Sequence, residues 1–326
     1  MTINEAVASS TDVRFSSGTI DFDIKPLAYS DTGIIFRRQG NESGEIVYLR
    51  ANPDCPAAND CIQYAPIVHG HMQWDIYPNY QGPAQINPTG WNHVRLVVAG
   101  EKMAVYINHE TEPTLIVPKL QGLSRNGGIA FKGPAIYANF VIRPGDPATL
   151  PAIHIPQPSP ETATHWLSAP PTALAGHAPT AADIPPPGSW HAIAAEPTGL
   201  VNLGRAFDVR EAHAISTGWL KTTVTAKAPT RRTVQIGYAR QASVFLNGRL
   251  VYSGNNPYYP PDHRLSPDGR LETDNATILL ELRQGQNEIV LAVGNSWQTS
   301  TGVIKPDPYG WGAELHFDTV SVITLQ

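Results

Sequence analysis

The sequence has few charged residues, no long apolar run and no excess of basic residues. Of its 326 residues, 16% are charged, and 23 basic against 28 acidic residues leave a formal net charge of -5. Because nucleic-acid binding needs a basic surface, this balance argues against a nucleic-acid partner. No stretch of about 18 consecutive apolar residues is present, so no membrane span is expected.

The first residues do not have the pattern of a secretory signal. They read MTINEAVASSTDVRF, without the basic start and the apolar core of a signal peptide. We therefore expect either a cytoplasmic protein or the mature form of a secreted or periplasmic one. The sequence leaves the compartment and the oligomeric state open.

Cysteine is also scarce, with only Cys55 and Cys61. This short separation allows either a small disulfide loop or two free thiols. A zinc site would need more ligands, and His69 and His71 downstream do not complete a known zinc spacing. We therefore predict no metal site and no firm cofactor. The sequence leaves a structural Ca²⁺ ion open, although no Asp-rich loop predicts one.

Proline and glycine are abundant, and they disfavour helices. The chain contains 30 prolines and 27 glycines, and both residues destabilise helix interiors. Alternation of apolar and polar residues predicts short strands in both halves of the chain, so the expected fold class is all-β. Clear hairpin signals are the turn at Gly100-Glu101 and the dipeptide Asn247-Gly248.

The expected strands fall into two groups separated by a Pro-rich stretch. They cover residues 15–25, 33–38, 45–50, 60–64, 72–77, 91–99, 102–108, 128–132 and 135–142, and then 219–226, 232–238, 243–246, 249–252, 276–282, 287–293, 312–317 and 319–324. The pair 276–282 and 287–293 is expected to form a further hairpin.

The prolines themselves mark the boundary between the groups. Twelve of the 30 prolines lie in residues 144–187, and such a segment is typical of a stiff linker. We therefore predict two antiparallel β-sandwich (jelly-roll) domains, residues 1–143 and 189–326, joined by a linker over 144–188. Trp166 within it is expected to lie against a domain surface.

Segments of the first half resemble a known family. In order they read FSSGTIDFDIKP, GIIFRR, EIVYLR, WNHVRLVVAGEKMAVYIN and GGIAFKGPAIYANFVI, and they resemble a concanavalin A-like lectin/glucanase domain of the laminin-G-like kind. The resemblance implies a β-sandwich that binds glycans, binds proteins or hydrolyses glycosides. The E-x-D-x-x-E strand of the hydrolases on this fold is absent, which argues against a glucanase.

The second half resembles a different sandwich family. VFLNGRLVYSG, LLELRQGQNEIVLAVGN and GWGAELHF are similar to a galactose-binding-like jelly roll, as found in glycosidase accessory domains. The resemblance implies a fold more than a ligand.

The segment 63–80, QYAPIVHGHMQWDIYPNY, concentrates aromatic, amide and carboxylate side chains. Such side chains bind sugars by ring stacking and hydrogen bonding, although the aromatics could equally be core residues. Tyr48 and Arg50 share a face of a neighbouring strand, and an arginine there suits a carboxylate or sugar hydroxyls, or a surface ion pair with Glu45 or Asp60. The predicted ligand-binding residues of the first domain are Arg37, Tyr48, Arg50, Gln63, Tyr64, Trp74 and Tyr77.

A polar and aromatic loop in the second domain is a further candidate, since loops often carry function. Tyr258, Tyr259 and His263 are predicted to bind ligand there, or else to serve rigid packing. Trp297 and Trp311 are binding aromatics or core residues.

Carbohydrate recognition through the concave face of the first sandwich is the function these residues favour, with a glycan or glycoside as partner. The alternative is an enzyme of hydrolase or lyase type, in which His69, His71 and Asp75 provide acid–base chemistry. If residues 72–77 form an unbroken strand, these three side chains share one face. No G-x-S-x-G, H-E-x-x-H, P-loop or G-x-G-x-x-G motif is present. A weaker alternative is a protein-interaction module.

Overall fold

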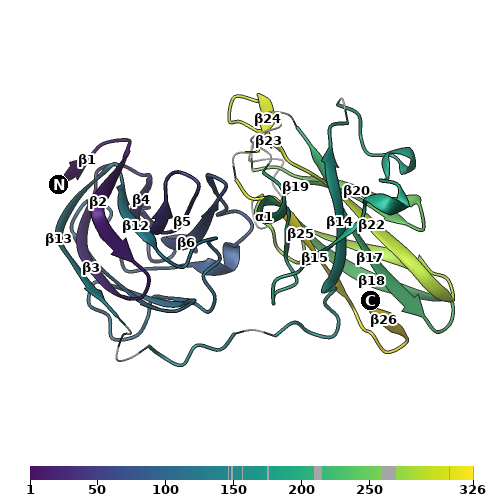
Figure 1. Cartoon of the computed structure of the whole chain (residues 1–326), viewed down its shortest axis with the longest axis horizontal. Coiled ribbons are helices and arrows are strands. Elements are labelled where there is room, and N and C mark those ends of the chain that lie inside the picture. The colour runs from purple at the N-terminus through teal and green to yellow at the C-terminus, as the bar shows by residue number, and fades with distance from the viewer. Residues whose placement is uncertain are drawn as a thin grey trace. The chain divides into compact units, whose positions relative to one another are not determined.

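The computed structural model describes residues 1–145, 147, 150–155, 157–174, 176–208, 215–258, 269–307 and 309–325. They form two compact units, Met1–Ile155 and Pro156–Gln326, and each is described by itself. Almost all regular structure is strand (Figure 1), which confirms the predicted all-β class. Within the described residues the helical elements are the four-residue α1 (Leu203–Ala206) and three short 3-10 turns, η1 (Pro78–Tyr80), η2 (Ala181–Asp183) and η3 (Pro187–Ser189).

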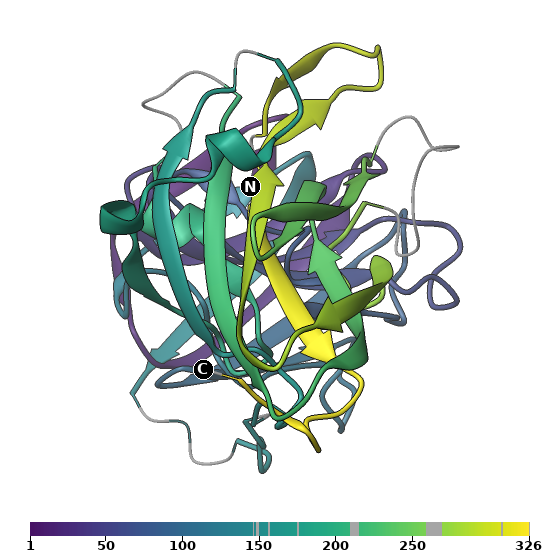
Figure 2. The same ribbon diagram turned by 90° about the vertical axis from the view of Figure 1, so that its right-hand side faces the viewer.

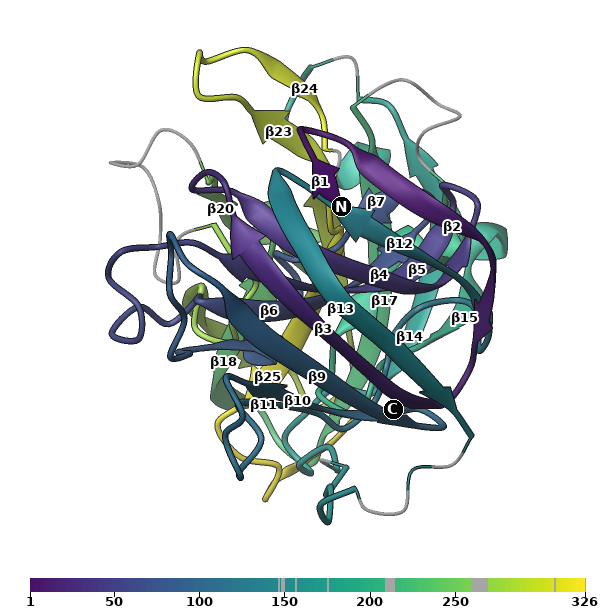
Figure 3. The same cartoon turned by 90° about the vertical axis from the view of Figure 1, so that its left-hand side faces the viewer.

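The first unit is a sandwich of two antiparallel sheets. Its first sheet has the order β1-β13-β3-β9-β10-β11, and its second sheet has the order β2-β12-β4-β5-β6-β7, with β8 paired to β6. Figure 3 shows β13, β3 and β9 side by side in the first sheet. The strands are β1 (Thr2–Ile3), β2 (Val7–Phe15), β3 (Gly18–Pro26), β4 (Asp31–Gln39), β5 (Ser43–Arg50), β6 (Ile62–Val68), β7 (His71–Met72), β8 (Gln81–Gly82), β9 (Asn92–Ala99), β10 (Lys102–Ile107), β11 (Leu115–Val117), β12 (Gly127–Lys132) and β13 (Ala135–Pro144).

The alternation along each strand decides which side chains fill the space between these two sheets. On β3, Ile20, Phe22 and Ile24 are buried, and the ring of Phe22 lies 6.0 Å from Tyr137 of β13. Tyr137 in turn lies 4.9 Å from Phe131 of β12 in the opposite sheet. Because side chains alternate between faces, the intervening residues of β3 point to the outer face of the first sheet.

The second unit is also a sandwich. A seven-stranded sheet with the order β15-β14-β17-β22-β19-β20, in which β26 pairs with β17, packs with a four-stranded sheet of order β16-β25-β18-β21, and β23 pairs with β24. Figure 2 shows this unit from a second direction. The strands are β14 (His165–Thr172), β15 (His191–Ala194), β16 (Val201–Asn202), β17 (Thr217–Ala226), β18 (Thr230–Tyr238), β19 (Arg240–Leu246), β20 (Arg249–Asn256), β21 (Ala276–Leu282), β22 (Gly285–Gly294), β23 (Ser296–Gln298), β24 (Ile304–Pro306), β25 (Gly312–Phe317) and β26 (Ile323–Leu325).

Part of the Pro-rich segment belongs to this second sandwich. β14 lies within residues 144–188 and pairs with β15 and β17. Trp166 of β14 is buried in the main core of this sandwich, so it does not lie on the outside of a domain as its place in a linker predicts. Ile184 and Trp190 pack on a second apolar cluster that contains Trp219 and Phe245. Strand pairing and side-chain packing therefore hold much of this segment, which composition alone describes as a linker.

Two of the expected hairpins form and one does not. Asn247 and Gly248 adopt positive φ values of 51° and 79° between β19 and β20, and β9 pairs with β10 across the Gly100 turn. The predicted hairpin of 276–282 with 287–293 is wrong, because β21 pairs with β18 whereas β22 pairs with β17 and β19. The side chain of Asn287 bonds to the backbone of Arg283 and Gly285, and the chain passes from one sheet to the other at this point.

The segment 55–77 also differs in part from expectation. Cys55 and Cys61 form a disulfide, which resolves the choice between a bridge and two thiols.

The strand expected over 72–77 is wrong, because β7 ends at Met72 and η1 follows from Pro78. The inference that His69, His71 and Asp75 share one strand face therefore has no basis.

Candidate functional site

The outer face of the second sheet of the first unit gathers six side chains of mixed chemistry, which we call the Arg50 cluster. Val47 packs in the interior opposite Tyr64 of β6, so Tyr48 and Arg50 of β5 lie on the other face of the sheet, where Tyr48 and its neighbour Gln63 are still fully buried. The register places Gly33 next to Tyr48 and Lys132, and Asp31 next to Arg50. The cluster comprises Asp31, Tyr48, Arg50, Gln63, Trp74 and Lys132.

Hydrogen bonds fix the centre of the Arg50 cluster. The Tyr48 hydroxyl donates to Oε1 of Gln63 at 2.7 Å, and Nη2 of Arg50 donates to the same oxygen at 2.8 Å. Nε2 of Gln63 donates to the carbonyl oxygen of Trp74 at 2.7 Å. The Arg50 guanidinium also lies 5.0 Å from the centre of the Tyr48 ring and 5.9 Å from that of Trp74, within the range of cation–π attraction. Four of the predicted ligand-binding residues are thus brought together.

Charged groups surround this centre. Asp31 Oδ1 lies 3.7 Å from Nε of Arg50, and its Oδ2 lies 3.1 Å from Nζ of Lys132. Asp60 Oδ2 lies 3.8 Å from Nη1 of Arg50. The Arg50–Asp60 ion pair, which the sequence suggested as an alternative to ligand binding, is therefore present. Asp31, Asp60 and Lys132 remain partly exposed, and carboxylate and ammonium groups therefore reach the surface beside the buried hydrogen bonds.

A groove of about 450 Å³ is lined by residues that precede β4 and follow β5 in the chain, and no member of the Arg50 cluster lines it. Tyr29 lies two residues before Asp31 and is 67% exposed, and Ala51 directly follows Arg50. The groove is lined by Lys25, Pro26, Leu27, Ala28, Tyr29, Ala51, Pro53, Pro88 and Thr89. An exposed aromatic ring and several prolines therefore lie next to the charged groups.

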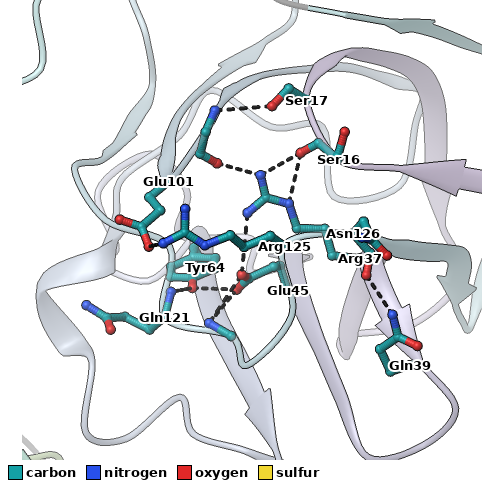
Figure 4. Close-up of polar contacts among 12 residues, drawn as sticks. Ser16, Ser17, Arg37, Gln39, Glu45, Tyr64, Glu101, Gln121, Arg125 and Asn126 are labelled. Atoms are coloured by element: carbon teal, nitrogen blue, oxygen red, sulfur yellow. Dashed lines mark hydrogen bonds and ion pairs between the residues drawn. The ribbon is translucent and has the colours of Figure 1, made fainter.

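Arg37 and Tyr64, two further predicted ligand-binding residues, lie in the interior instead (Figure 4). Arg37 donates to the carbonyl oxygens of Ser16 and Gly100, and its Nη1 lies 4.0 Å from Oε1 of Glu45. The Tyr64 hydroxyl donates to Oε2 of Glu45 at 2.7 Å. Arg37 therefore links the second sheet to the β9–β10 turn of the first sheet, Tyr64 bonds within the second sheet and to the backbone of Gln121, and neither side chain faces solvent.

Burial dominates the ionisation of this interior network. It raises the pKa of Tyr64 well above the usual value, and the nearby Glu45 carboxylate adds to the effect. It lowers the pKa of Arg37, while the attraction of Glu45 acts in the opposite direction. The backbone N–H of Gly122 donates to Glu45 as well, at 3.0 Å to Oε2. Glu45 is therefore the shared acceptor of the network.

Four other residues predicted from segment 63–80 do not belong to the Arg50 cluster: Tyr77, His69, His71 and Asp75. Tyr77 stacks on Tyr80, with ring centres 5.7 Å apart. His69 lies in the turn between β6 and β7 with a φ of 49°, and His71 begins β7. Asp75 is fully buried. The catalytic role of His69, His71 and Asp75 stays a prediction.

In the second unit, the predicted aromatic residues that the structure describes pack on other side chains of this unit. Tyr258 stacks on Trp297 with ring centres 5.9 Å apart. Trp311 is a core residue whose indole N–H donates to the carbonyl oxygen of Val293. Tyr259 and His263 lie outside the described residues.

The described ranges contain neither a clustered set of metal-ligating side chains nor a membrane-spanning helix. Among these residues no group of three or more His, Cys, Asp and Glu side chains is placed to hold a metal ion. In the same part of the chain no helix is both long and apolar enough to cross a bilayer.

Comparison with known proteins gives distant structural likenesses. No protein-family model matches the chain, and no curated protein matches it in sequence. The chain is similar to the carbohydrate-binding module CBM66 from Bacillus subtilis at 14% identity, over 43% of this chain and 92% of that one, with a TM-score of 0.31.

Two other solved structures illustrate the range of these likenesses. A family 35 carbohydrate-binding module from an environmental isolate is 19% identical over 34% of this chain and 71% of its own, with a TM-score of 0.22. Domains LG4-5 of the mouse laminin α1 chain are 11% identical over 99% of this chain and 91% of their own, with a TM-score of 0.27. At such identities and scores these structures do not bear on the ligand of this chain.

Two members of the Arg50 cluster, Asp31 and Lys132, and the neighbouring Tyr29 were missed by reasoning from the sequence. Asp31 and Lys132 lie on separate strands that only the sheet register brings next to Arg50. Tyr29 had a visible signal, since an aromatic residue in the short segment LAYS between β3 and β4 is a candidate for exposure.

Proposed function

We propose that the first unit recognises carbohydrate at the groove beside Tyr29 and at the adjoining Arg50 cluster. The observation that supports this is the exposed Tyr29 ring in a groove that borders partly exposed carboxylate and ammonium groups. Sugars have apolar ring faces that stack on aromatic side chains, and hydroxyls that bond to charged and amide groups. The proposal keeps Tyr48, Arg50, Gln63 and Trp74 as site residues, and it adds Tyr29, Asp31 and Lys132.

The buried half of the Arg50 cluster supports binding by holding polar groups in position. Arg50 is fixed by Gln63 and Tyr48 on one side and by two carboxylates on the other. Side chains that are already ordered lose less conformational entropy when a ligand binds. In this proposal Asp31, Lys132 and the Tyr29 ring bind the ligand, and Arg50 holds the Asp31 carboxylate in position.

The test compares two exposed aromatic residues in the full chain. Calorimetric titration with soluble plant and bacterial polysaccharides is expected to show weaker binding for Tyr29→Ala by about tenfold or more, because burying one aromatic ring contributes about 1.5–3 kcal/mol. Trp91, which is 49% exposed and lines neither the groove nor the cluster, provides the matched control Trp91→Ala.

A third variant tests the polar part of the site. Asp31→Asn keeps the size of the side chain but removes the charge that pairs with Arg50 and Lys132, and we expect severalfold weaker binding with an unchanged circular dichroism spectrum. Equal affinities for the original chain, Tyr29→Ala and Asp31→Asn would refute the proposed site. Absence of binding to all of these polysaccharides would refute the function.

A further inference from the structure

A second cavity of the first unit lies on the other sheet, at the outer face of β9 and β10. Its volume is about 420 Å³, which is within the usual range for small-molecule sites. We name it the β9–β10 cup, and it is lined by His93, Arg95, Val97, Tyr106, His109, Glu110 and Thr111. We propose that this cup binds an uncharged saccharide.

Cross-strand register builds the floor of the cup. The strands β3, β9 and β10 are neighbours in the first sheet (Figure 3). Arg95 of β9 lies directly opposite Asp21 of β3 on one side and Tyr106 of β10 on the other. Residues in these positions lie on the same face of the sheet. The Tyr106 ring, the Arg95 guanidinium and the Asp21 carboxylate therefore form one row across three strands.

Ion pairs orient the Arg95 side chain. Its Nε donates to Oδ1 of Asp21 at 2.7 Å, and Arg143 from β13 donates to the other oxygen of the same carboxylate at 2.5 Å. Arg95 is 51% exposed on its side chain, and Arg143 is 62% exposed. Two arginines thus bind the same aspartate, but of these two only Arg95 lines the cup.

Two histidines form a wall of the cup. Their rings, those of His93 and His109, stack with centres 4.2 Å apart and planes 16° from parallel. Nδ1 of His93 donates to Oδ1 of Asp23 at 2.8 Å, and Asn139 donates to the other oxygen of that carboxylate at 2.5 Å. The His93 ring is therefore held in one orientation, and it supports His109.

A two-residue turn presents His109 to the cup. Asn108 and His109 have φ values of 51° and 62°, the two positive values of a type I′ turn, and the N–H of Glu110 donates to the carbonyl oxygen of Ile107 at 3.1 Å across it. The turn directly follows β10, and it places His109 against the His93 ring of β9.

The charges that line the cup select the class of ligand. Arg95 and Glu110 carry opposite charges and line the same cavity, and Arg95 is already paired with Asp21, so the cup has no excess charge of one sign to select an ion. A neutral molecule with many hydroxyls can donate to the carboxylate, accept from the guanidinium, and place an apolar face on the Tyr106 ring. A saccharide without charge has these properties. This site lies on the opposite sheet from the Arg50 cluster, and it does not depend on the function proposed there.

The two arginines of Asp21 supply a matched pair of variants. Full-length protein is titrated by calorimetry with methyl β-D-glucoside, methyl β-D-galactoside and cellotetraose, with methyl β-D-glucuronide as the charged comparison. Arg95→Ala is expected to weaken binding of the neutral probe by about tenfold or more, as expected for the loss of a charged hydrogen bond. Arg143→Ala, which also loses a bond to Asp21, is expected to stay within about twofold.

A second measurement does not depend on any variant. In a two-dimensional ¹H–¹⁵N NMR spectrum of the histidine rings, saturating neutral probe is expected to move the signals of His93 and His109, and the glucuronide is expected to move them less. The proposal is overturned if the neutral probes leave these signals in place at about 10 mM, or if Arg95→Ala and Arg143→Ala bind alike. Binding that is lost in Tyr29→Ala and kept in Arg95→Ala overturns the cup alone, and the reverse result counts against the Tyr29 groove alone.

Discussion

Replacing Glu45 by alanine tests the buried network that joins the two sheets of the first unit. The Glu45 side chain is 1% exposed, and it accepts hydrogen bonds from the Tyr64 hydroxyl and from the Gly122 N–H. Its loss leaves these donors without their acceptor and removes the negative charge nearest to Arg37. A buried donor without a partner costs about 1–3 kcal/mol, and loss of one partner of a buried ion pair costs about 3–5 kcal/mol.

The costs of the unpaired donors and of the broken ion pair do not simply add, because both partners of Glu45 keep other hydrogen bonds. Arg37 still donates to the Ser16 and Gly100 carbonyls, and the Tyr64 hydroxyl still accepts from the Gln121 N–H. We therefore expect Glu45→Ala to lower the free energy of unfolding by about 3–5 kcal/mol in total. The measurement is urea denaturation of the full chain followed by circular dichroism. Hydrogen exchange should show faster exchange in the peptides that contain β4, β5 and β6.

The matched control is a second Glu–Arg pair drawn in Figure 4. Arg125 donates to Glu101 at 2.7 Å, but the two side chains are 79% and 42% exposed. Water solvates both partners, so Glu101→Ala should cost no more than about 1 kcal/mol. The reasoning is refuted if Glu45→Ala and Glu101→Ala destabilise the protein equally, or if exchange changes only in the second unit.

Three more changes have defined outcomes. Burial acts to raise the pKa of Asp23, but hydrogen bonds from Asn139 and His93 outweigh it and lower the pKa. The ionised Asp23 carboxylate therefore stabilises the fold at neutral pH, and this contribution is lost on acidification below about pH 4. Asp23→Asn should reduce the acid sensitivity of the free energy of unfolding measured between pH 2 and pH 7. An unchanged pH profile would contradict this. Phe245→Ala should cost about 3–5 kcal/mol in urea denaturation, because Trp219 and Trp190 pack around this residue, and a cost below about 1 kcal/mol would show that the cluster is unimportant. Reduction of the Cys55–Cys61 bridge should cost roughly 2 kcal/mol, since it closes a short loop, and Cys55→Ser with Cys61→Ser should then show no effect of reductant.

Much of the fold could be predicted because strand periodicity is local. The alternation of Ile20, Phe22 and Ile24 and the Asn247-Gly248 turn are visible in a few consecutive residues. The pairing of β22 was predicted wrongly, because a short turn at Gly285 is compatible both with a hairpin and with a crossing between sheets. The side chain of Asn287 bonds across this turn, and the sequence pattern does not show that contact.

The candidate site could be predicted only in part. Tyr48 and Arg50 share a face by period alone, and the chemistry of Gln63 and Trp74 suggested that they belong with them. The same reasoning included Arg37 and Tyr64, because the pattern did not show that they lie between the sheets. The change of face at Arg37 follows from its positive φ of 52° in an irregular part of β4.

By itself the amino-acid sequence determined the class of this protein, since abundant proline and glycine exclude long helices and alternating residues favour antiparallel sheets. It also supplied the two cysteines close enough to join. Tertiary structure alone decided which side chains meet: Asp31 with Arg50, Asp21 with Arg95, and His93 with His109. The physical reason is that strand periodicity is encoded between neighbouring residues, whereas sheet register depends on packing and hydrogen bonds between residues far apart in the chain.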